Sequence, residues 1–209
     1  MHTSMEALGK LFGSVARVKL MKLFLFNEEE SITKADAAKR AKVTPQAATR
    51  ELGVLERAGM IRKKSFFKEG KMLKNGKPGK KRRVQGYVLN QNFRYLIPLQ
   101  SMLMHSAPMQ QKEITEKLSR IGKVKVIIVA GIFIQDPESR IDILVAGDDI
   151  SSTKLRNAIT SMEAEIGREL RYAIFDTPDF RYRMGVCDRL VRDVFDYPHE
   201  IVVDRIGLA

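Results

Sequence analysis

Residues 44–59 read TPQAATRELGVLERAG, and this stretch decides the fold of the first half of the chain. Thr44 is a typical helix cap, and Pro45 suits the first helical position, where its missing N–H would have no partner anyway. Gly59 supplies the left-handed residue that often ends a helix. The stretch therefore predicts one complete helix. Its apolar residues at helical spacing should face a core: Ala48, Leu52 and Leu55.

The opposite face of this helix is polar or small. It carries Gln46, Thr49, Arg50, Gly53 and Arg57, which follow one another at helical spacing. Such a face is suited to lying in a groove of a partner molecule.

A strongly basic hairpin is predicted after this helix. Its strands are expected at 60–67 and 84–89, and the turn signals Asn75-Gly76 and Pro78-Gly79 place a long tip at 68–83. Between positions 62 and 83 the chain has eleven Lys or Arg residues and one acid, Glu69, which is +10 of the total net charge of +12. A basic segment of this kind predicts a polyanionic partner and locates its contact.

Two further helices are predicted upstream, at 15–26 and 34–41, with Ser14 and Thr33 as their caps and a short strand beginning at Ile32. The first of them has a wide apolar stripe: Val18, Leu20, Met21, Leu23, Phe24 and Leu25. Two interpretations of this stripe remain open. Either all of it belongs to the domain core, or part of it covers a partner subunit.

Helix, helix, short turn, helix and two-stranded hairpin is the order of a winged helix-turn-helix. Residues 12–90 resemble the winged-helix domains of ArsR-type and MarR-type transcriptional regulators, through 12–20, the Thr44 helix and 87–90. The resemblance implies that the Thr44 helix enters the major groove of DNA, where Gln46, Thr49 and Arg50 read base edges. It also implies that the hairpin, or wing, neutralises phosphates through seven cations: Lys71, Lys74, Lys77, Lys80, Lys81, Arg82 and Arg83.

Segment 91–122 is predicted to be a helical linker between domains at 1–90 and 123–209. An apolar helix is expected at 92–105, kinked or restarted at Pro98, and a second helix at 109–119. The first of these helices either contacts the second subunit of a dimer or packs against the chain's own C-terminal domain.

The C-terminal segment is mildly acidic and alternates strands with helices. Strands are expected at 124–130, 141–148 and 171–175, and helices at 153–166 and, capped by Thr177, around 180–184. This order predicts a small α/β layer, so the fold class of the whole chain is α+β.

Residues 124–207 resemble the minimal nucleotidyltransferase domain. The resemblance lies in Gly131, segments 139–145 and 166–170, Phe180 and the helix at 189–193. Active members of that family hold nucleotide phosphates with a Gly-Ser pair and metal ions with two carboxylates one residue apart. Here Ile132 replaces the Ser and Arg140 replaces the first carboxylate, which leaves Asp142 alone. A guanidinium adds repulsion where cations must bind, so the degenerate site of Gly131, Arg140 and Asp142 predicts no transferase activity and no metal.

The combined interpretation is a cytoplasmic, homodimeric regulator of transcription that binds double-stranded DNA and needs no cofactor. Neither a secretory signal nor a membrane-spanning stretch is predicted, and Cys187 is the single cysteine. The alternatives are a nucleotidyltransferase targeted by a winged helix and a protein-binding adaptor. The second domain is either a sensor of a phosphate ligand through Arg140 or, preferably, a docking or dimerisation platform. Double-stranded RNA is disfavoured as a partner, since its deep major groove does not admit a reading helix.

Overall fold

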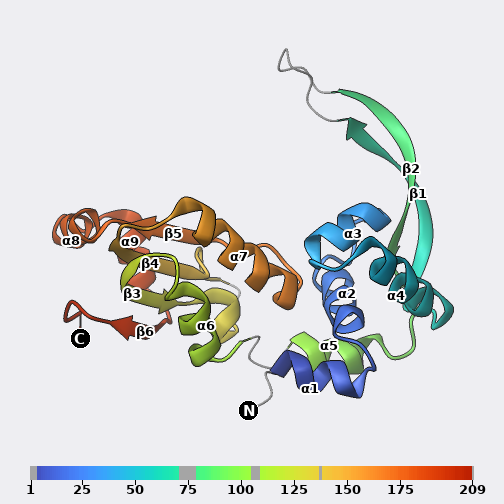
Figure 1. Ribbon diagram of the computed structural model, residues 1–209, viewed down its shortest axis with the longest axis horizontal. Helices are drawn as coiled ribbons and strands as arrows, with labels where there is room; N and C mark the ends of the chain where they lie inside the picture. Colours follow the sequence, from blue (N-terminus) through green and yellow to red (C-terminus); the bar gives the residue numbers. More distant parts are fainter. Residues whose placement is uncertain (1–3, 71–78, 105–108, 137, 209) are drawn as a thin grey trace. The chain divides into compact units, whose positions relative to one another are not determined.

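The computed structural model describes residues 4–70, 79–104, 109–136 and 138–208. Within these ranges the chain is mixed α+β, with nine α-helices and two small sheets (Figure 1). It divides into two compact units. Unit 1 comprises Met1–Met104 with Ala164–Arg168, and unit 2 comprises His105–Glu163 with Glu169–Ala209. The predicted fold class is therefore confirmed at the level of mixed α and β elements.

Unit 1 contains the helices α1 (Ser4–Leu11), α2 (Val15–Phe26), α3 (Lys34–Arg40), α4 (Pro45–Arg57) and α5 (Leu96–Met104). Helices α2, α3 and α4 begin where the sequence places their caps. The side-chain oxygens of Ser14, Thr33 and Thr44 each accept a hydrogen bond from the backbone N–H three residues ahead, at 3.2–3.3 Å. All three predicted caps are confirmed.

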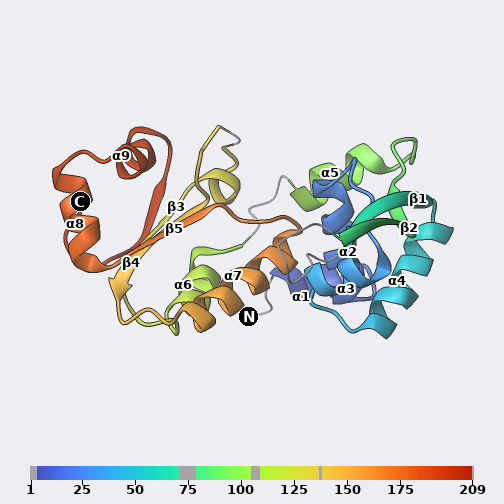
Figure 2. The same cartoon turned by 90° about the horizontal axis from the view of Figure 1, so that it is seen from above.

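Helix α4 has the boundaries and the buried side that its sequence predicts. Pro45 occupies its first turn, and Gly59 follows its C-terminus with φ of +80°. Ala48, Leu52 and Leu55 are buried in the core of unit 1. In Figure 2, α4 lies with α2 and α3 at the base of the hairpin.

The hairpin is longer and more regular than predicted. Strand β1 (Ile61–Gly70) pairs with β2 (Gly79–Leu89) in antiparallel register, from Ile61 opposite Leu89 to Lys68 opposite Arg82. Half of the segment expected as a loop tip, at 68–70 and 79–83, is therefore strand, because the ladder continues through basic residues, with a register shift between Lys68 and Gly70. Figure 1 shows the hairpin extending past the helices of unit 1.

A third strand-like segment joins the base of the hairpin. Ile32 forms an isolated antiparallel bridge with Tyr87, and the two residues exchange both backbone hydrogen bonds at 2.8 Å. A Cβ on Gly86 would lie 2.5 Å from the carbonyl oxygen of Ile32, so this close approach requires glycine.

The apolar stripe of α2 is buried within the chain. Its six predicted members are at most 4% exposed, and they belong to one core cluster with residues of α3, α4, both hairpin strands and α5. Of the two interpretations left open by the sequence, the structure supports the domain core.

Helix α5 begins later than expected, at Leu96 instead of Asn92. Pro98 then lies in its first turn, where no N–H is needed, so the proline starts the helix and does not interrupt it. Leu96 and Leu103 are buried, whereas Ile97 is 75% exposed.

Unit 2 is built around a four-stranded sheet in the order β5-β4-β3-β6. The strands are β3 (Lys123–Val129), β4 (Ile143–Asp148), β5 (Tyr172–Phe175) and β6 (Glu200–Asp204). Only β4 and β5 are parallel, and α7 (Ser152–Ile166) connects them. The other helices are α6 (Gln111–Leu118), α8 (Thr177–Gly185), α9 (Arg189–Asp196) and the 3-10 turn η1 (Gly131–Ile134). Apolar residues of β3, β4, β5, α8 and α9 form one core cluster of this unit.

Two expectations for unit 2 were wrong in detail, and one strand was missed. Strand β4 begins at Ile143 and not at Ile141, because the N–H groups of Asp142 and Ile143 both point to the carbonyl oxygen of Arg171. The cap position of α8 is Asp176, whose backbone is extended, and Thr177 is already helical. Strand β6 was not predicted.

Among the described residues, no helix is long and apolar enough to cross a membrane.

Candidate nucleic-acid interface

The exposed face of α4 brings together the three predicted base-reading residues. Gln46, Thr49 and Arg50 are all exposed, and their spacing places them on one side of the helix. Glu51, the next residue, is buried. The polar face predicted for this helix is therefore present, with side chains that donate and accept hydrogen bonds.

The described strands of the hairpin hold eight of its eleven basic residues. Five of these have no carboxylate partner within the described part of the chain: Arg62, Lys64, Lys80, Arg82 and Arg83. Lys81, also a predicted phosphate contact, lies 3.7 Å from Glu69. The predicted contacts Lys71, Lys74 and Lys77 lie outside the described residues. Arg62 and Lys64 are exposed cations of β1 that were not predicted as phosphate contacts, although they belong to the same basic segment.

One face of the hairpin collects several of these cations. Arg62 lies opposite Val88, Lys64 opposite Gly86 and Lys68 opposite Arg82, and directly paired residues project to the same face of an antiparallel ladder. Because successive side chains alternate between faces, Arg62, Lys64, Lys68 and Arg82 share one face. Only Lys68 of this group has an ion-pair partner among the described residues, Asp36.

Ion pairs join the hairpin to α3 and α4. Lys63 of β1 lies 2.8 Å from Glu56 of α4, and Lys68 pairs with Asp36 of α3. Burial raises the pKa of the Asp36 carboxyl, but hydrogen bonds from Lys68 and Thr33 outweigh it and hold that pKa below its usual value. These contacts link the hairpin to both helices.

A buried carboxylate supports the exposed face of α4. The Glu51 side chain is 2% exposed, and its Oε2 accepts a hydrogen bond from Arg17 Nε of α2 at 2.8 Å. Its Oε1 accepts one from Arg50 Nε at 3.0 Å. Burial raises the pKa of the Glu51 carboxyl, but the hydrogen bonds from Arg17 and Arg50 outweigh this effect, so the pKa is lowered. Sequence reasoning missed Glu51, although it stands three residues after buried Ala48, on the apolar stripe.

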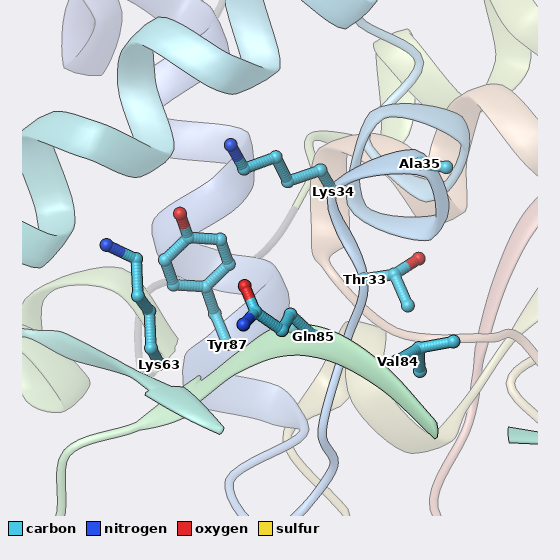
Figure 3. Close-up of a pocket in the computed structure, with 8 residues that line it drawn as sticks. Thr33, Lys34, Ala35, Lys63, Val84, Gln85 and Tyr87 are labelled. Carbon is cyan, nitrogen blue, oxygen red and sulfur yellow. The ribbon is translucent and has the colours of Figure 1, made fainter. Parts of the chain in front are cut away.

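A pocket of about 400 Å³ opens between the start of α3 and the base of the hairpin. Lys34, Lys63, Gln85 and Tyr87 are among its lining residues, and in Figure 3 the ammonium groups of Lys34 and Lys63 and the hydroxyl of Tyr87 extend toward the same side. Burial and the neighbouring carboxylate of Glu56 raise the pKa of the Tyr87 phenol. The pocket therefore presents hydrogen-bond donors next to the basic hairpin.

The degenerate nucleotidyltransferase site predicted in unit 2 consists of Gly131, Arg140 and Asp142, and only two of these residues are shown in contact with each other. Gly131 and Asp142 lie together: the backbone of Gly131 has φ of +53°, and a Cβ there would lie 2.3 Å from Asp142 Oδ1. Asp142 is fully buried, and its oxygens accept hydrogen bonds from the N–H of Ile132 at 3.1 Å and of Arg171 at 2.8 Å. This carboxylate therefore holds η1 and the start of β5 in place.

Arg140, the third residue of that site, lies in a different environment. Its side chain is exposed, and its Nη1 is 3.2 Å from Asp193 of α9. Among the described residues, no group of three or more His, Cys, Asp or Glu side chains is arranged to hold a metal ion.

Comparison of the chain with protein-family models, with curated proteins and with solved structures found no match. What these surfaces bind must therefore be inferred from their own residues.

Proposed function

We propose that this chain is a DNA-binding transcriptional regulator. Unit 1 would be a winged helix-turn-helix that places α4 in the major groove and the basic hairpin, as a wing, on the phosphate backbone. One observation carries the proposal: an exposed polar helix face adjoins a hairpin whose described strands have eight basic residues and one acid. B-form DNA suits both surfaces, because its major groove admits a helix and its backbone is a dense row of negative charge.

The order and pairing of the elements support this assignment. Helices α2, α3 and α4 precede β1 and β2, and Ile32 bridges to Tyr87 at the edge of the hairpin. A winged helix uses the same sequence of elements, with a short strand between its first two helices. The ion pair between Lys63 and Glu56 joins the hairpin to α4, the two elements that carry the proposed contact surfaces.

The two surfaces would contribute different parts of the binding free energy. The hairpin cations without carboxylate partners would release counterions from the DNA and provide affinity that depends little on sequence. Gln46, Thr49 and Arg50 would provide sequence discrimination, since their side chains match the donors and acceptors of base edges.

A homodimer is part of the proposal. Unit 1 exposes large apolar side chains outside the proposed DNA-binding surface, in α1, α5 and the residue before α5: Leu11, Tyr95, Ile97 and Met102. Helices α1 and α5 both pack against α2. A second subunit that covers these side chains would place two α4 helices on one DNA duplex.

Unit 2 is proposed to have no transferase activity and to serve as a docking or dimerisation platform. The carboxylate of Asp142 is buried and accepts hydrogen bonds from two backbone N–H groups, so it is poorly placed to bind Mg²⁺. Incubation with labelled nucleoside triphosphates, Mg²⁺ or Mn²⁺ and candidate acceptors provides the test. Label transfer that disappears in Asp142→Asn, with the variant still folded, would establish the enzyme instead.

Selection of duplexes from a random DNA pool tests the regulator proposal. The purified protein is compared with Gln46→Ala and Thr49→Ala at near-physiological salt, and Lys154→Ala in unit 2 serves as a control. We expect an enriched motif with two half-sites about one helical turn apart, relaxed in the two α4 variants and unchanged in the control. A pool without enrichment would contradict sequence-specific binding, and a single half-site would contradict the dimer alone.

A further inference from the structure

The guanidinium of Arg50 is held by one of its edges. Its Nε donates to Glu51 Oε1 at 3.0 Å, and its Nη2 lies 3.0 Å from the same oxygen. The side chain is nevertheless 71% exposed, so the rest of the group faces outward from α4. Arg50 is thus exposed and oriented at the same time.

Glu51 is itself fixed from the opposite side. Its second oxygen accepts a hydrogen bond from Arg17 Nε at 2.8 Å, and Arg17 Nη1 donates to the backbone carbonyl of Phe12 at 2.8 Å. Because the Glu51 side chain is 2% exposed, it has little freedom to follow a movement of Arg50. The chain Phe12–Arg17–Glu51 therefore anchors the guanidinium of Arg50 to the body of unit 1.

The edge that Glu51 leaves available has a definite recognition chemistry. A guanidinium has five N–H donors, and the Nε–Nη2 side is occupied. The terminal edge, made of Nη1 and the outer hydrogen of Nη2, remains and presents two nearly parallel donors. In the major groove only guanine offers two adjacent acceptors, O6 and N7, whereas adenine pairs its N7 acceptor with an N6 donor.

We propose that Arg50 recognises a guanine in each half-site of the target DNA, with Glu51 as the positioning residue and Arg17 as its anchor. This inference rests on the proposed DNA-binding function and adds the identity of one base to it. Because the guanidinium is already oriented, less side-chain freedom is lost when it binds, which favours two simultaneous hydrogen bonds over one. Discrimination against another base at this position is expected to be roughly 5- to 150-fold.

The experiment uses the enriched duplex from the selection described above. Each guanine in a half-site is replaced in turn by 7-deazaguanine, which lacks the N7 acceptor but keeps Watson–Crick pairing. Affinities are measured for the wild-type chain, Arg50→Lys and Glu51→Gln, with Arg156→Lys as a matched control at an exposed position of α7 in unit 2. Wild type and Arg156→Lys should lose affinity at one guanine, and Arg50→Lys should bind the modified and unmodified duplexes almost equally.

Glu51→Gln separates positioning from simple stability. A folded Glu51→Gln protein should keep its affinity for random duplexes while its preference for guanine over 7-deazaguanine falls several-fold, an effect that lower stability alone does not produce. If this variant does not fold, Arg17→Lys provides the same comparison. The inference is overturned if folded Glu51→Gln or Arg17→Lys keeps the wild-type preference for guanine over 7-deazaguanine. It is also overturned if Arg50→Lys keeps that preference. Both outcomes would leave the proposed DNA binding intact. Failure of the proposed function itself looks different, because no motif would be enriched at all.

Discussion

The salt dependence of DNA binding should reveal which hairpin cations contact phosphate. Arg62, Lys64 and Arg82 share one face of the hairpin and have no carboxylate partner among the described residues. The perturbation is their joint replacement, Arg62→Gln/Lys64→Gln/Arg82→Gln. Exposed strand residues of this kind make few contacts within the chain, so the fold should survive the change.

The expected magnitude follows from counterion release. Each phosphate neutralised on B-form DNA adds about −0.9 to the slope of log affinity against log salt. Loss of three contacts should make the slope shallower by about 2.7. Between 50 and 200 mM salt, wild type should therefore lose about 40-fold more affinity than the triple variant.

Fluorescence anisotropy with a labelled duplex, at several salt concentrations, measures this slope. The matched control removes three exposed cations from unit 2, Lys154→Gln/Arg156→Gln/Arg181→Gln, and changes the net charge of the chain equally. We expect the control to retain the wild-type slope. Equal slopes for wild type and the hairpin variant would refute the assignment, and equal reductions in both variants would show that net charge alone governs binding.

The remaining predictions concern stability. Asp142→Asn should lower the free energy of unfolding in urea by about 1–3 kcal/mol, since an amide cannot accept hydrogen bonds at both positions; an unchanged midpoint would show that the buried carboxylate is dispensable. Gly86→Ala should cost about 1–3 kcal/mol in thermal unfolding, because its Cβ would meet the carbonyl oxygen of Ile32, whereas Gly185→Ala, with open space around it, should not destabilise; similar losses would contradict the geometry. Because folding lowers the pKa of Glu51, its carboxylate contributes stability above the unfolded pKa of about 4.3, and this stability is lost as pH falls through the lower folded pKa. Glu51→Gln should therefore flatten the acid limb of a plot of unfolding free energy against pH. Parallel plots for the variant and wild type would argue against the network.

Local chemistry made the helices of unit 1 predictable from the sequence. A cap such as Ser14 or Thr44 acts on backbone groups within one turn of itself, so its effect does not depend on distant residues. The spacing of Ala48, Leu52 and Leu55 likewise identified the buried side of α4. The exposed side of α4 followed from this, whereas the choice of Gln46, Thr49 and Arg50 as base-reading candidates came from the resemblance to winged-helix regulators and stays a prediction.

Pairing between distant segments was not predictable in the same way. Lys68 and Arg82 have low intrinsic strand preference, yet they extend the ladder because their neighbours are already paired. The bridge between Ile32 and Tyr87 joins residues far apart in the sequence, and only the missing side chain of Gly86 indicates a close approach there. Strand β6 is short and half polar, so its place beside β3 depends on the finished sheet.

Buried charge was the hardest feature to interpret from sequence, and two acids show why. Glu51 was overlooked because acids are usually exposed. Its position on the apolar stripe of α4 turns it toward the core, and Arg17 of α2 supplies the ion-pair partner that a buried carboxylate needs. Asp142 was interpreted as the remnant of a metal site, yet its oxygens receive backbone N–H groups from Ile132 and Arg171. Whether a carboxylate serves a ligand or the fold depends on the direction from which donors approach it. Sequence spacing does not encode that direction. The donors to Glu51 include Arg50 of the proposed base-reading surface, whereas the donors to Asp142 are backbone groups, which make this carboxylate part of the framework of unit 2.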